Sequence, residues 1–481
     1  MFQNDGMFLN NRFRKISSRG LVTGALSALA LSLTVSPALA ECTVVDPNGI
    51  VIPCPLGFNE SQASNYNLIT TVCPSGKNEP TFQQRCNNVV GAALSGHNPQ
   101  VVNALQPVTP SQISFQGDQA TKLSGGQLAT LNTAIIARLT SLRLGLTDGT
   151  NTMDLRFART IQSSDNFVST VPNLLTGGAA SADSPNAFSP LSGFLNAIYN
   201  FGNVNSTFQQ QAGFNYNIGG FIAGADYRYT DNLIFGAAFS YQRSNTNFNN
   251  SLGDTNSNSY IGSLYGTFYA TDRFYIDGVA TYGWINYNLN RKILYTISPN
   301  KIDSQGDSVN TTAKSSPNGN QYSFSLGSGY DYAWNALTVN PYVRLNYTKL
   351  YVNSYSESGG DGWATRISSQ GVNSFTTALG TRLSYAVSIP WGVAMPQLWG
   401  EWVHEFENNA QSIEVGYLGN YTNNQNFSVF TARPDRDYFT LGAGISGVFA
   451  HGVSAFFSYE ALLGYNNTNS NQFVLGGRIE F

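Results

Sequence analysis

Residues 274–284, FYIDGVATYGW, decide the fold of this 481-residue chain. Aromatic, aliphatic and small side chains occupy every second position from Phe274 to Trp284, and Asp277 and Thr281 lie between them. A period of two residues is typical of a β-strand, whose side chains point alternately to its two faces. One face of this strand is suited to lipid and the other to a polar interior, which indicates a transmembrane β-barrel.

The same alternation recurs from residue 191 to the C-terminus. Residues 375–385, FTTALGTRLSY, and residues 473–481, FVLGGRIEF, repeat it with polar or charged residues on one face. Counting such stretches predicts twelve strands, which start near Leu191, Ala212, Leu233, Ser257, Arg273, Asn320, Leu337, Gly371, Val393, Phe427, Val453 and Asn471. The predicted fold class is all-β, a 12-stranded antiparallel transmembrane β-barrel over residues 191–481, preceded by a short, partly helical, disulfide-bearing segment.

The connections between these stretches alternate in length. Short turns occur at residues 230–232, 271–272, 334–336, 389–392 and 451–452, and long polar connections occupy residues 247–258, 288–320, 354–370 and 408–426. Short periplasmic turns and long outer loops are typical of outer-membrane barrels. A secreted β-sandwich or propeller is the competing architecture, and the shortage of charge on long glycine-rich strands argues against it.

The composition excludes several other classes of protein. Charged residues make up 11% of the chain, against about 25% in ordinary soluble domains. The hydrophobic fraction of 42% and the mean hydropathy of −0.17 are too low for a bundle of membrane helices. Aromatic residues reach 13%, which argues against disorder. The net charge of −3 leaves no basic surface for nucleic acid.

Residues 1–40 have the three parts of a signal peptide. Four basic residues lie within residues 12–19, an apolar run covers residues 21–35, and Ala38-Leu39-Ala40 supplies the small-x-small cleavage pattern. A lipoprotein site at Cys42 is the alternative, and it is disfavoured because Glu41 stands where a small residue is required. The sequence therefore predicts an exported protein.

Residues 41–106 form a short passenger-like segment that holds every cysteine of the chain, namely Cys42, Cys54, Cys73 and Cys86. In an exported protein four cysteines predict two disulfides, and three connectivities stay open. Pairing of neighbours would close two small loops. A zinc site is disfavoured because the spacings are wide and the nearest histidine is His97. We expect no core there, because the segment is short and polar, and we expect no metal and no cofactor.

Residues 107–190 are predicted to be a helical connector and linker. Apolar residues recur there at steps of three and four, which is one stripe of an amphipathic helix: Leu128, Leu131, Ile135, Leu139, Leu142 and Leu146. A shorter helix is predicted at residues 101–105, ended by Pro107 and Pro110. The stripe fits either a partner-binding or trimerising helix or a helix that packs on its own chain, and the second is favoured.

Several stretches carry a resemblance to a known family. Residues 213–241 cover the second and third predicted strands, residues 396–406 read PQLWGEWVHEF, and residues 476–481 read GGRIEF. In this order they resemble the autotransporter (type Va secretion) outer-membrane β-barrel translocator family, and residues 107–145 are similar to its connector. The resemblance implies a monomer in the outer membrane of a Gram-negative bacterium, in contact with outer-membrane lipid.

The resemblance also implies partners and site residues. Gly476, Ile479 and Phe481 resemble the signal read by the barrel-assembly machinery, and periplasmic chaperones would escort the chain. A helix would occupy the barrel lumen. We look for it first between residues 145 and 191, and the amphipathic helix described above is the second candidate.

The function implied by the resemblance is display or secretion of the N-terminal segment, with a role in surface adhesion. The segment departs from the family because it is far shorter than the usual solenoid passengers and shows no solenoid repeat. The alternative function is an outer-membrane pore or structural barrel without exported cargo. A trimeric adhesin is disfavoured, because each chain of that class supplies only a small part of one barrel.

Enzymatic activity is not predicted. Residues 306–309, Gly-Asp-Ser-Val, resemble the Gly-Asp-Ser-Leu block of surface esterases, but they lie in a polar connection. A serine nucleophile needs a base within hydrogen-bond reach, and none of His97, His404 and His451 stands in the expected Asp-x-x-His pattern. We therefore expect no catalytic residue and no cofactor.

Overall fold

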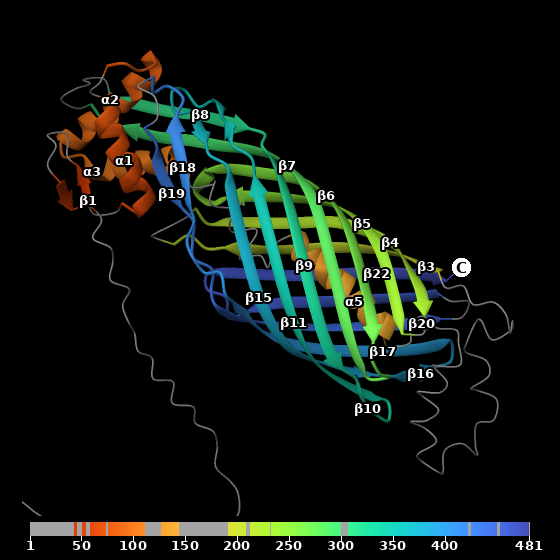
Figure 1. The fold of residues 1–481 in the computed structure, drawn as a ribbon. Coiled ribbons are helices and arrows are strands. Elements are labelled where there is room, and N and C mark those ends of the chain that lie inside the picture. The colour runs from red at the N-terminus through yellow and green to blue at the C-terminus, as the bar shows by residue number, and fades with distance from the viewer. Residues whose placement is uncertain are drawn as a thin grey trace, which may run out of the picture. The chain divides into compact units, whose positions relative to one another are not determined.

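Twelve long antiparallel strands close into a barrel within the described part of the chain (Figure 1). They are β3 (Leu191–Val204), β4 (Phe214–Thr230), β5 (Leu233–Phe248), β6 (Gly253–Tyr269), β7 (Phe274–Ile297), β9 (Asn318–Tyr330), β11 (Leu337–Val352), β15 (Gln370–Tyr385), β17 (Gly392–Glu405), β20 (Asp437–Phe449), β21 (Val453–Leu463) and β22 (Thr468–Glu480). The sheet closes because β22 pairs with β3 and β9 pairs with both β7 and β11. The predicted fold class is confirmed.

The computed structural model describes residues 43–45, 51–53, 58–73, 76–110, 127–143, 191–207, 212–230, 232–299, 306–421, 425–449 and 453–480. The predicted signal peptide, residues 1–40, lies outside them, as does most of the predicted linker. Residues 41–481 form one compact unit. The domain boundaries given above stay predictions.

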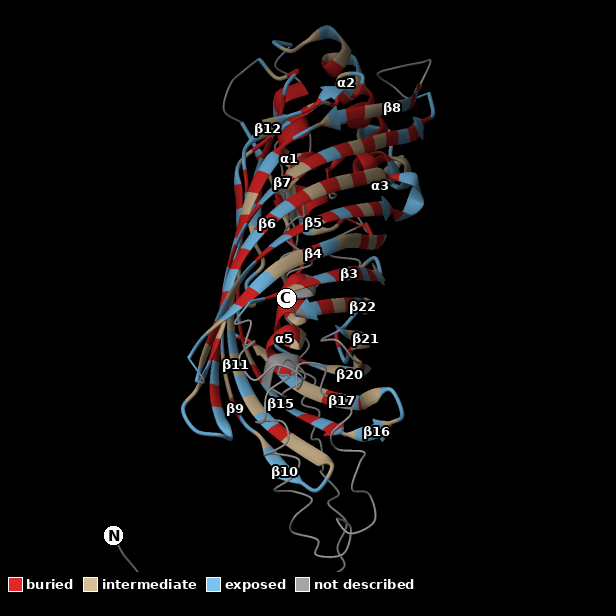
Figure 2. Ribbon diagram, turned by 90° about the vertical axis from the view of Figure 1, so that its right-hand side faces the viewer, coloured by how far each residue is buried: buried red, intermediate tan, exposed pale blue. Residues whose placement is uncertain are grey.

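The alternation that predicted β7 is seen in the burial of its side chains. Tyr282 and Trp284 are 60% and 55% exposed on the outer face, whereas Tyr275 and Thr281 are 2% and 5% exposed on the inner face. Figure 2 shows the same alternation of buried and exposed residues along the neighbouring strands. The exposed set is aromatic and aliphatic and the inner set is largely polar, as lipid outside and a packed polar lumen require.

The two ends of the barrel differ. At one end the strands meet in short turns, such as the one between β4 and β5, and β22 ends there; we call it the short-turn end. At the other, extended end, β7 leaves its partner β9 at Asn286, continues to Ile297 and pairs with β8 (Asp307–Ser315). β8 also pairs with β13 (Ser358–Gly359). The predicted polar loop at residues 288–320 is therefore largely β-structure.

A separate four-stranded sheet lies at the extended end. Its order is β12 (Tyr355–Ser356), β14 (Thr365–Ile367), β18 (Ser412–Tyr417) and β19 (Phe427–Phe430). The predicted start of a membrane strand at Phe427 is wrong, because that strand is β20, which begins at Asp437. Residues 427–430 alternate like a membrane strand, but Pro434 and the charges around it interrupt the pattern before β20.

Three N-terminal helices pack on the extended end. They are α1 (Glu60–Val72), α2 (Pro80–Leu94) and α3 (Asn98–Val108), and we call residues 58–110 the cap. α1 begins with a capping box in which Asn59 and Gln62 bond each other's backbone N–H groups. α3 contains the predicted short helix, but it continues to Val108 instead of ending before Pro107. Pro107, which has no backbone N–H to donate, lies in the last turn of the helix.

The cap has a buried core, contrary to the sequence prediction. Phe82, Val89 and Leu105 are fully buried in one cluster with Ile293 of β7 and Trp363. Residues 41–106 are too short to form a core by themselves, and residues of the barrel part of the chain supply the other half of this core. A disulfide joins Cys73, at the end of α1, to Cys86 of α2. The other two cysteines, Cys42 and Cys54, lie outside the described residues.

The remaining described elements are small or lie apart from the strands. They are the hairpin β1 (Thr43–Val45) and β2 (Val51–Pro53), the short strands β10 (Tyr332–Trp334) and β16 (Val387–Ile389), a 3-10 turn at Asn249–Ser251, and α5 (Gln127–Arg143). α5 is the predicted amphipathic helix, and Figure 1 shows it inside the barrel.

Candidate functional site

The barrel lumen is occupied by α5. Its apolar stripe, Leu131, Ile135 and Leu139, is fully buried against isoleucines of the barrel wall such as Ile198 and Ile222. The stripe therefore packs on its own chain, as the favoured interpretation held. Residues 145–191, the first candidate for a luminal helix, are almost entirely outside the described residues, and the second candidate is the helix that the structure places in the lumen.

A buried ion pair fixes the C-terminal part of α5 to the wall. Arg138 pairs with Asp226 of β4, and the two side chains are 3% and 2% exposed. The Arg138 Nη2 also donates to the Ser192 hydroxyl at 3.1 Å, and the guanidinium lies 5.3 Å from the Phe194 ring centroid. The Tyr265 hydroxyl donates to the second Asp226 oxygen at 2.5 Å. A buried charge pair of this kind needs such surrounding bonds to be tolerated.

The position of this pair sets the direction of α5. Asp226 lies near the short-turn end of β4, which finishes at Thr230. Arg138 is near the C-terminal end of α5, so the helix runs with its N-terminus toward the extended end. In the middle of the helix, the Asn132 amide donates to the Ser323 hydroxyl of β9 at 3.2 Å. The N-terminal end of α5 thus faces the end of the barrel on which the cap packs.

The other half of the lumen holds a second charged cluster. Glu401 of β17 accepts hydrogen bonds from the Arg344 guanidinium at 3.2 Å and the Tyr342 hydroxyl at 2.7 Å. The Trp399 indole donates to Glu460 at 2.8 Å. A cavity of about 50 Å³ separates this cluster from α5. That volume admits a few water molecules rather than an organic substrate.

The Arg382 guanidinium completes this cluster. It lies 4.5 Å from the Trp399 ring centroid and donates to the side-chain amide oxygen of Gln397 at 3.0 Å. The charged side chains of both luminal clusters therefore have partners within the barrel. They need no catalytic explanation.

The cap is held to the extended end by a buried arginine of β7. Arg291 pairs with Glu357, with Nε–Oε1 and Nη2–Oε2 distances of 2.8 and 2.5 Å. Its Nη1 donates to the carbonyl oxygens of Pro107 and Val108, at the end of α3, and its Nη2 donates to that of Trp363. Burial opposes the charged form, but the Glu357 carboxylate outweighs it and raises the pKa of Arg291.

α1 covers the free edge of β19. The hydroxyls of Ser61 and Ser64 accept hydrogen bonds from the backbone N–H groups of Phe430 and Ser428, at 3.0 and 2.9 Å. Ser61 and Ser64 are three residues apart and therefore lie on one face of the helix. Ser428 and Phe430 are two residues apart and therefore lie on one side of the strand, so the two pairs can meet. The edge amides that would attract a foreign strand are thereby satisfied.

The Gly-Asp-Ser-Val stretch serves this interface. Arg85 of α2 pairs with Asp307 and with Asp361. Asp307 also accepts a hydrogen bond from the Tyr295 hydroxyl at 3.2 Å. Ser308 faces Thr296, with 3.5 Å between the hydroxyl oxygens. The stretch is thus part of the contact between cap and barrel. Within the described ranges no group of three or more candidate metal ligands occurs.

The residues of the implied assembly signal lie on the last strand. Ile479 of β22 is 52% exposed on the outer face. Gly476 leaves room on the inner face for the Phe456 ring, which would lie 2.2 Å from an added Cβ. Phe481 lies outside the described residues. That these residues form a signal for the assembly machinery stays a prediction.

The chain is similar to a known protein family and to several known proteins. A family model described as the autotransporter beta-domain matches residues 193–460. Esterase EstA of Pseudomonas aeruginosa is 26% identical over 209 residues, which are 42% of this chain and 29% of that protein. Outer membrane protein A of Rickettsia conorii is 26% identical over 223 residues, 43% of this chain and 10% of that protein. The chain thus spans under a third of the length of these relatives.

Solved structures of barrels are similar in arrangement. The translocator domain of the autotransporter NalP from Neisseria meningitidis has a TM-score of 0.47 at 15% identity, over 63% of this chain and 92% of that one. The transport unit of AIDA-I from Escherichia coli has a TM-score of 0.41 at 16% identity, over 62% and 92%.

Two further findings bear on identity. Among the helices of the described residues, none combines the length and the apolar character needed to cross a bilayer. The family match covers more than half of the chain, from the first barrel strand into β21. The chain belongs to the autotransporter beta-domain family, and it is an outer-membrane β-barrel of a Gram-negative bacterium.

Proposed function

We propose that this barrel displays its own N-terminal segment at the cell surface and keeps it there as a docked cap. The observation that carries the proposal is the shared core of the cap and the extended end, in which Phe82 and Leu105 are buried with Trp363 and Ile293. A passenger destined for release would expose such a surface on departure. The disulfide and the Arg291–Glu357 pair support a fixed arrangement.

The direction of the chain supports display rather than periplasmic retention. The extended end corresponds to the long outer loops of outer-membrane barrels, and the short-turn end corresponds to the periplasmic side. The cap docks on the extended end, and α5, which comes between the cap and the first barrel strand in the sequence, lies in the lumen. On this view the exposed surface of the cap is what an adhesion partner would meet.

An epitope experiment on intact cells tests the proposal. An epitope tag inserted after Gly96, between α2 and α3, should bind antibody on intact cells. The matched control carries the tag after Asn335, in the short turn before β11, and should bind only after the outer membrane is permeabilised. Both sites have a positive φ and an exposed backbone, so the insertions are comparable. A Gly96 tag that is silent until permeabilisation would overturn the proposal.

The pore is the alternative function, and α5 argues against it. The helix and the charged clusters occupy the lumen of the described barrel, and a cavity of about 50 Å³ lies beside the helix. Reconstituted in a planar bilayer, the native chain should therefore conduct poorly. A large and stable conductance from the native chain would favour the pore.

A further inference from the structure

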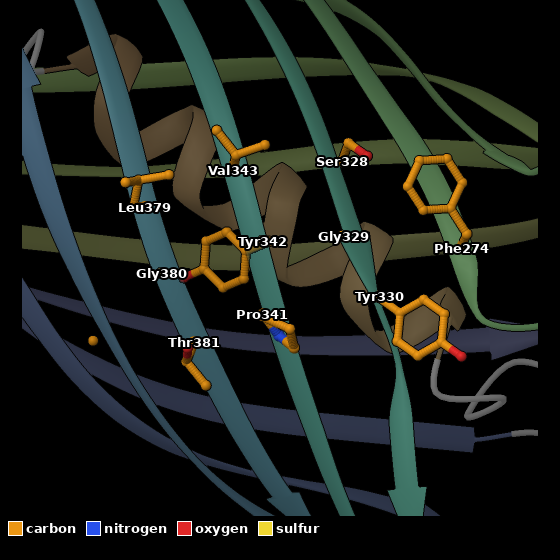
Figure 3. Close-up of a pocket in the computed structure, with 11 residues that line it drawn as sticks. Phe274, Ser328, Gly329, Tyr330, Pro341, Tyr342, Val343, Leu379, Gly380 and Thr381 are labelled. Atoms are coloured by element: carbon orange, nitrogen blue, oxygen red, sulfur yellow. The ribbon is translucent and has the colours of Figure 1, made fainter.

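A groove of about 620 Å³ lies on the outer wall of the barrel. It crosses five neighbouring strands, from β7 through β9, β11 and β15 to β17. In Figure 3 its residues lie on the strands in front of α5, so the groove is seen from outside. Because the chain is an outer-membrane barrel, this face meets lipid.

The groove exists because the outer side chains are small there. Ser328, Pro341, Thr381 and Gly400 supply short side chains or none at all along neighbouring strands. The outer face elsewhere carries large residues, such as Leu264 at 67% exposure. With adjacent strands about 4.8 Å apart, a path across five of them is roughly 19 Å long. An extended acyl chain has matching length and chemistry.

The groove rises from the membrane surface toward the middle of the bilayer. It starts at Phe274, the first residue of β7, beside Tyr330, the last residue of β9. It ends at Gly400, eight residues beyond the start of β17 at Gly392. Phe274 pairs with Tyr330 and Thr381 pairs with Gly400, so the groove follows a row across the strands. The tilt of the strands, roughly 35–45° from the barrel axis, carries this row inward. A chain entering at the short-turn end would follow this slope inward.

The lower end of the groove carries complementary charges. Arg273 is exposed in the turn that precedes Phe274, and its carbonyl oxygen accepts a hydrogen bond from the Asp331 N–H at 2.8 Å. The Tyr330 hydroxyl beside it raises the pKa of Arg273. Asp272 is exposed next to it, so a cation and an anion stand together at the entrance.

Aromatic side chains fix the level of this entrance in the membrane. Tyr332 and Trp334 of β10 are 55% and 67% exposed at the same end of the barrel. Tyrosine and tryptophan concentrate at the level of lipid headgroups. Arg273 and Asp272 therefore lie at the depth of the phosphates on the short-turn side.

We propose that the groove binds one acyl chain of a zwitterionic, ethanolamine-type phospholipid, whose phosphate contacts Arg273 and whose ammonium contacts Asp272. A phospholipid with an anionic headgroup satisfies only one of the two charges and is repelled by the other. The pairing of opposite charges at the mouth selects the headgroup, and the row of small residues selects the place on the wall.

Native mass spectrometry of the full chain tests this site. The barrel is extracted from bilayers of equal parts phosphatidylethanolamine and phosphatidylglycerol, and the lipids retained after detergent washing are counted. We expect retained phosphatidylethanolamine on the native chain. Arg273→Gln and Gly400→Phe should each reduce that retention about tenfold, the first by removing the phosphate contact and the second by filling the groove.

Matched variants provide the controls. Gly262→Phe adds the same side chain to the outer face of β6, where an added Cβ meets nothing within 4 Å, and should retain lipid like the native chain. Arg366→Gln removes an exposed arginine at the other end. Heat-modifiable migration confirms that each variant folds. If Gly400→Phe does not fold, Arg273→Gln still tests the proposal, because Arg273 lies outside the strands. Unchanged retention in Arg273→Gln, or equal retention of both lipids by the native chain, would overturn the proposal.

Discussion

Arg291 and Glu357 form a buried ion pair at the point where the cap meets the barrel. Their side chains are 3% and 6% exposed, and the same guanidinium also bonds the last carbonyl groups of α3. Glu357 in turn accepts hydrogen bonds from the backbone N–H and the hydroxyl of Thr365 at 2.9 and 2.6 Å. One charge pair therefore joins β7, α3 and the four-stranded sheet.

Arg291→Ala should loosen the cap. It leaves the Glu357 carboxylate buried without its partner, a change that typically destabilises by about 3–5 kcal/mol. The measurement uses a specific protease site placed within residues 111–126. After cleavage the native cap should stay on the cells, and the Arg291→Ala cap should appear in the medium. The control is Arg366→Ala, which removes an exposed arginine of the four-stranded sheet and should keep its cap. Equal retention by all three proteins would contradict this role.

Arg138→Ala should open the lumen. Removing this guanidinium leaves the Asp226 carboxylate buried and unpaired, so the C-terminal part of α5 loses its anchor. We expect frequent conductance steps in a planar bilayer where the native chain is quiet. The double variant Arg138→Met, Asp226→Leu removes both charges and should restore a quiet lumen. If Arg138→Ala conducts no more than the native chain, the ion pair does not hold the helix.

Acid should weaken the start of α2 through Glu79. This carboxylate accepts the Phe82 N–H at 2.8 Å, and that hydrogen bond lowers the pKa of Glu79. A lowered folded-state pKa gives stability that is complete above the ordinary value near ~4.3 and is lost as the pH falls through the lowered value. Cleavage of the cap by pepsin should rise in that window. Glu79→Gln should cleave faster at pH 5 and differ less from the native chain at lower pH; a constant difference would argue against the titration.

Loss of the Cys73–Cys86 disulfide should loosen the cap but spare the barrel. The two cysteines are 13 residues apart, and closing a loop of that size contributes roughly 3 kcal/mol. Hydrogen exchange of α1 and α2 should accelerate in Cys73→Ser, Cys86→Ser, while exchange in β7 within the barrel wall stays slow. Reductant should reproduce the effect in the native chain and add nothing in the variant. Acceleration that spreads equally into the barrel strands would show that the cap is not a separate unit of stability.

The barrel could be predicted from the sequence because each strand carries its own evidence. In β7 the step of two residues is set by the lipid on one side and the lumen on the other, so the pattern is local. The same rule misplaced the strand near Phe427, because four alternating residues satisfy the pattern whether they face lipid or α1. Length and the interruption at Pro434 separate the two cases.

The occupied lumen and the cap could be predicted only in part. The stripe of α5 indicated a helix that packs on its own chain, but its anchor joins Arg138 to Asp226 across 88 residues. The core of the cap was missed because its other half, including Trp363, comes from a connection that looked polar. No local sequence pattern identifies either contact, because both depend on how the closed barrel brings distant segments together.

The path of the chain through the barrel has a mechanical consequence. The cap lies at one mouth, α5 lies in the lumen, and the covalent chain returns to form the ring that surrounds α5. Three packed helices are wider than the single helix that the lumen admits. The cap therefore cannot follow α5 into the lumen while it stays folded. A pull on α5 toward the short-turn end can draw the cap into the lumen only after the cap unfolds, so the strength of that small fold sets the resistance.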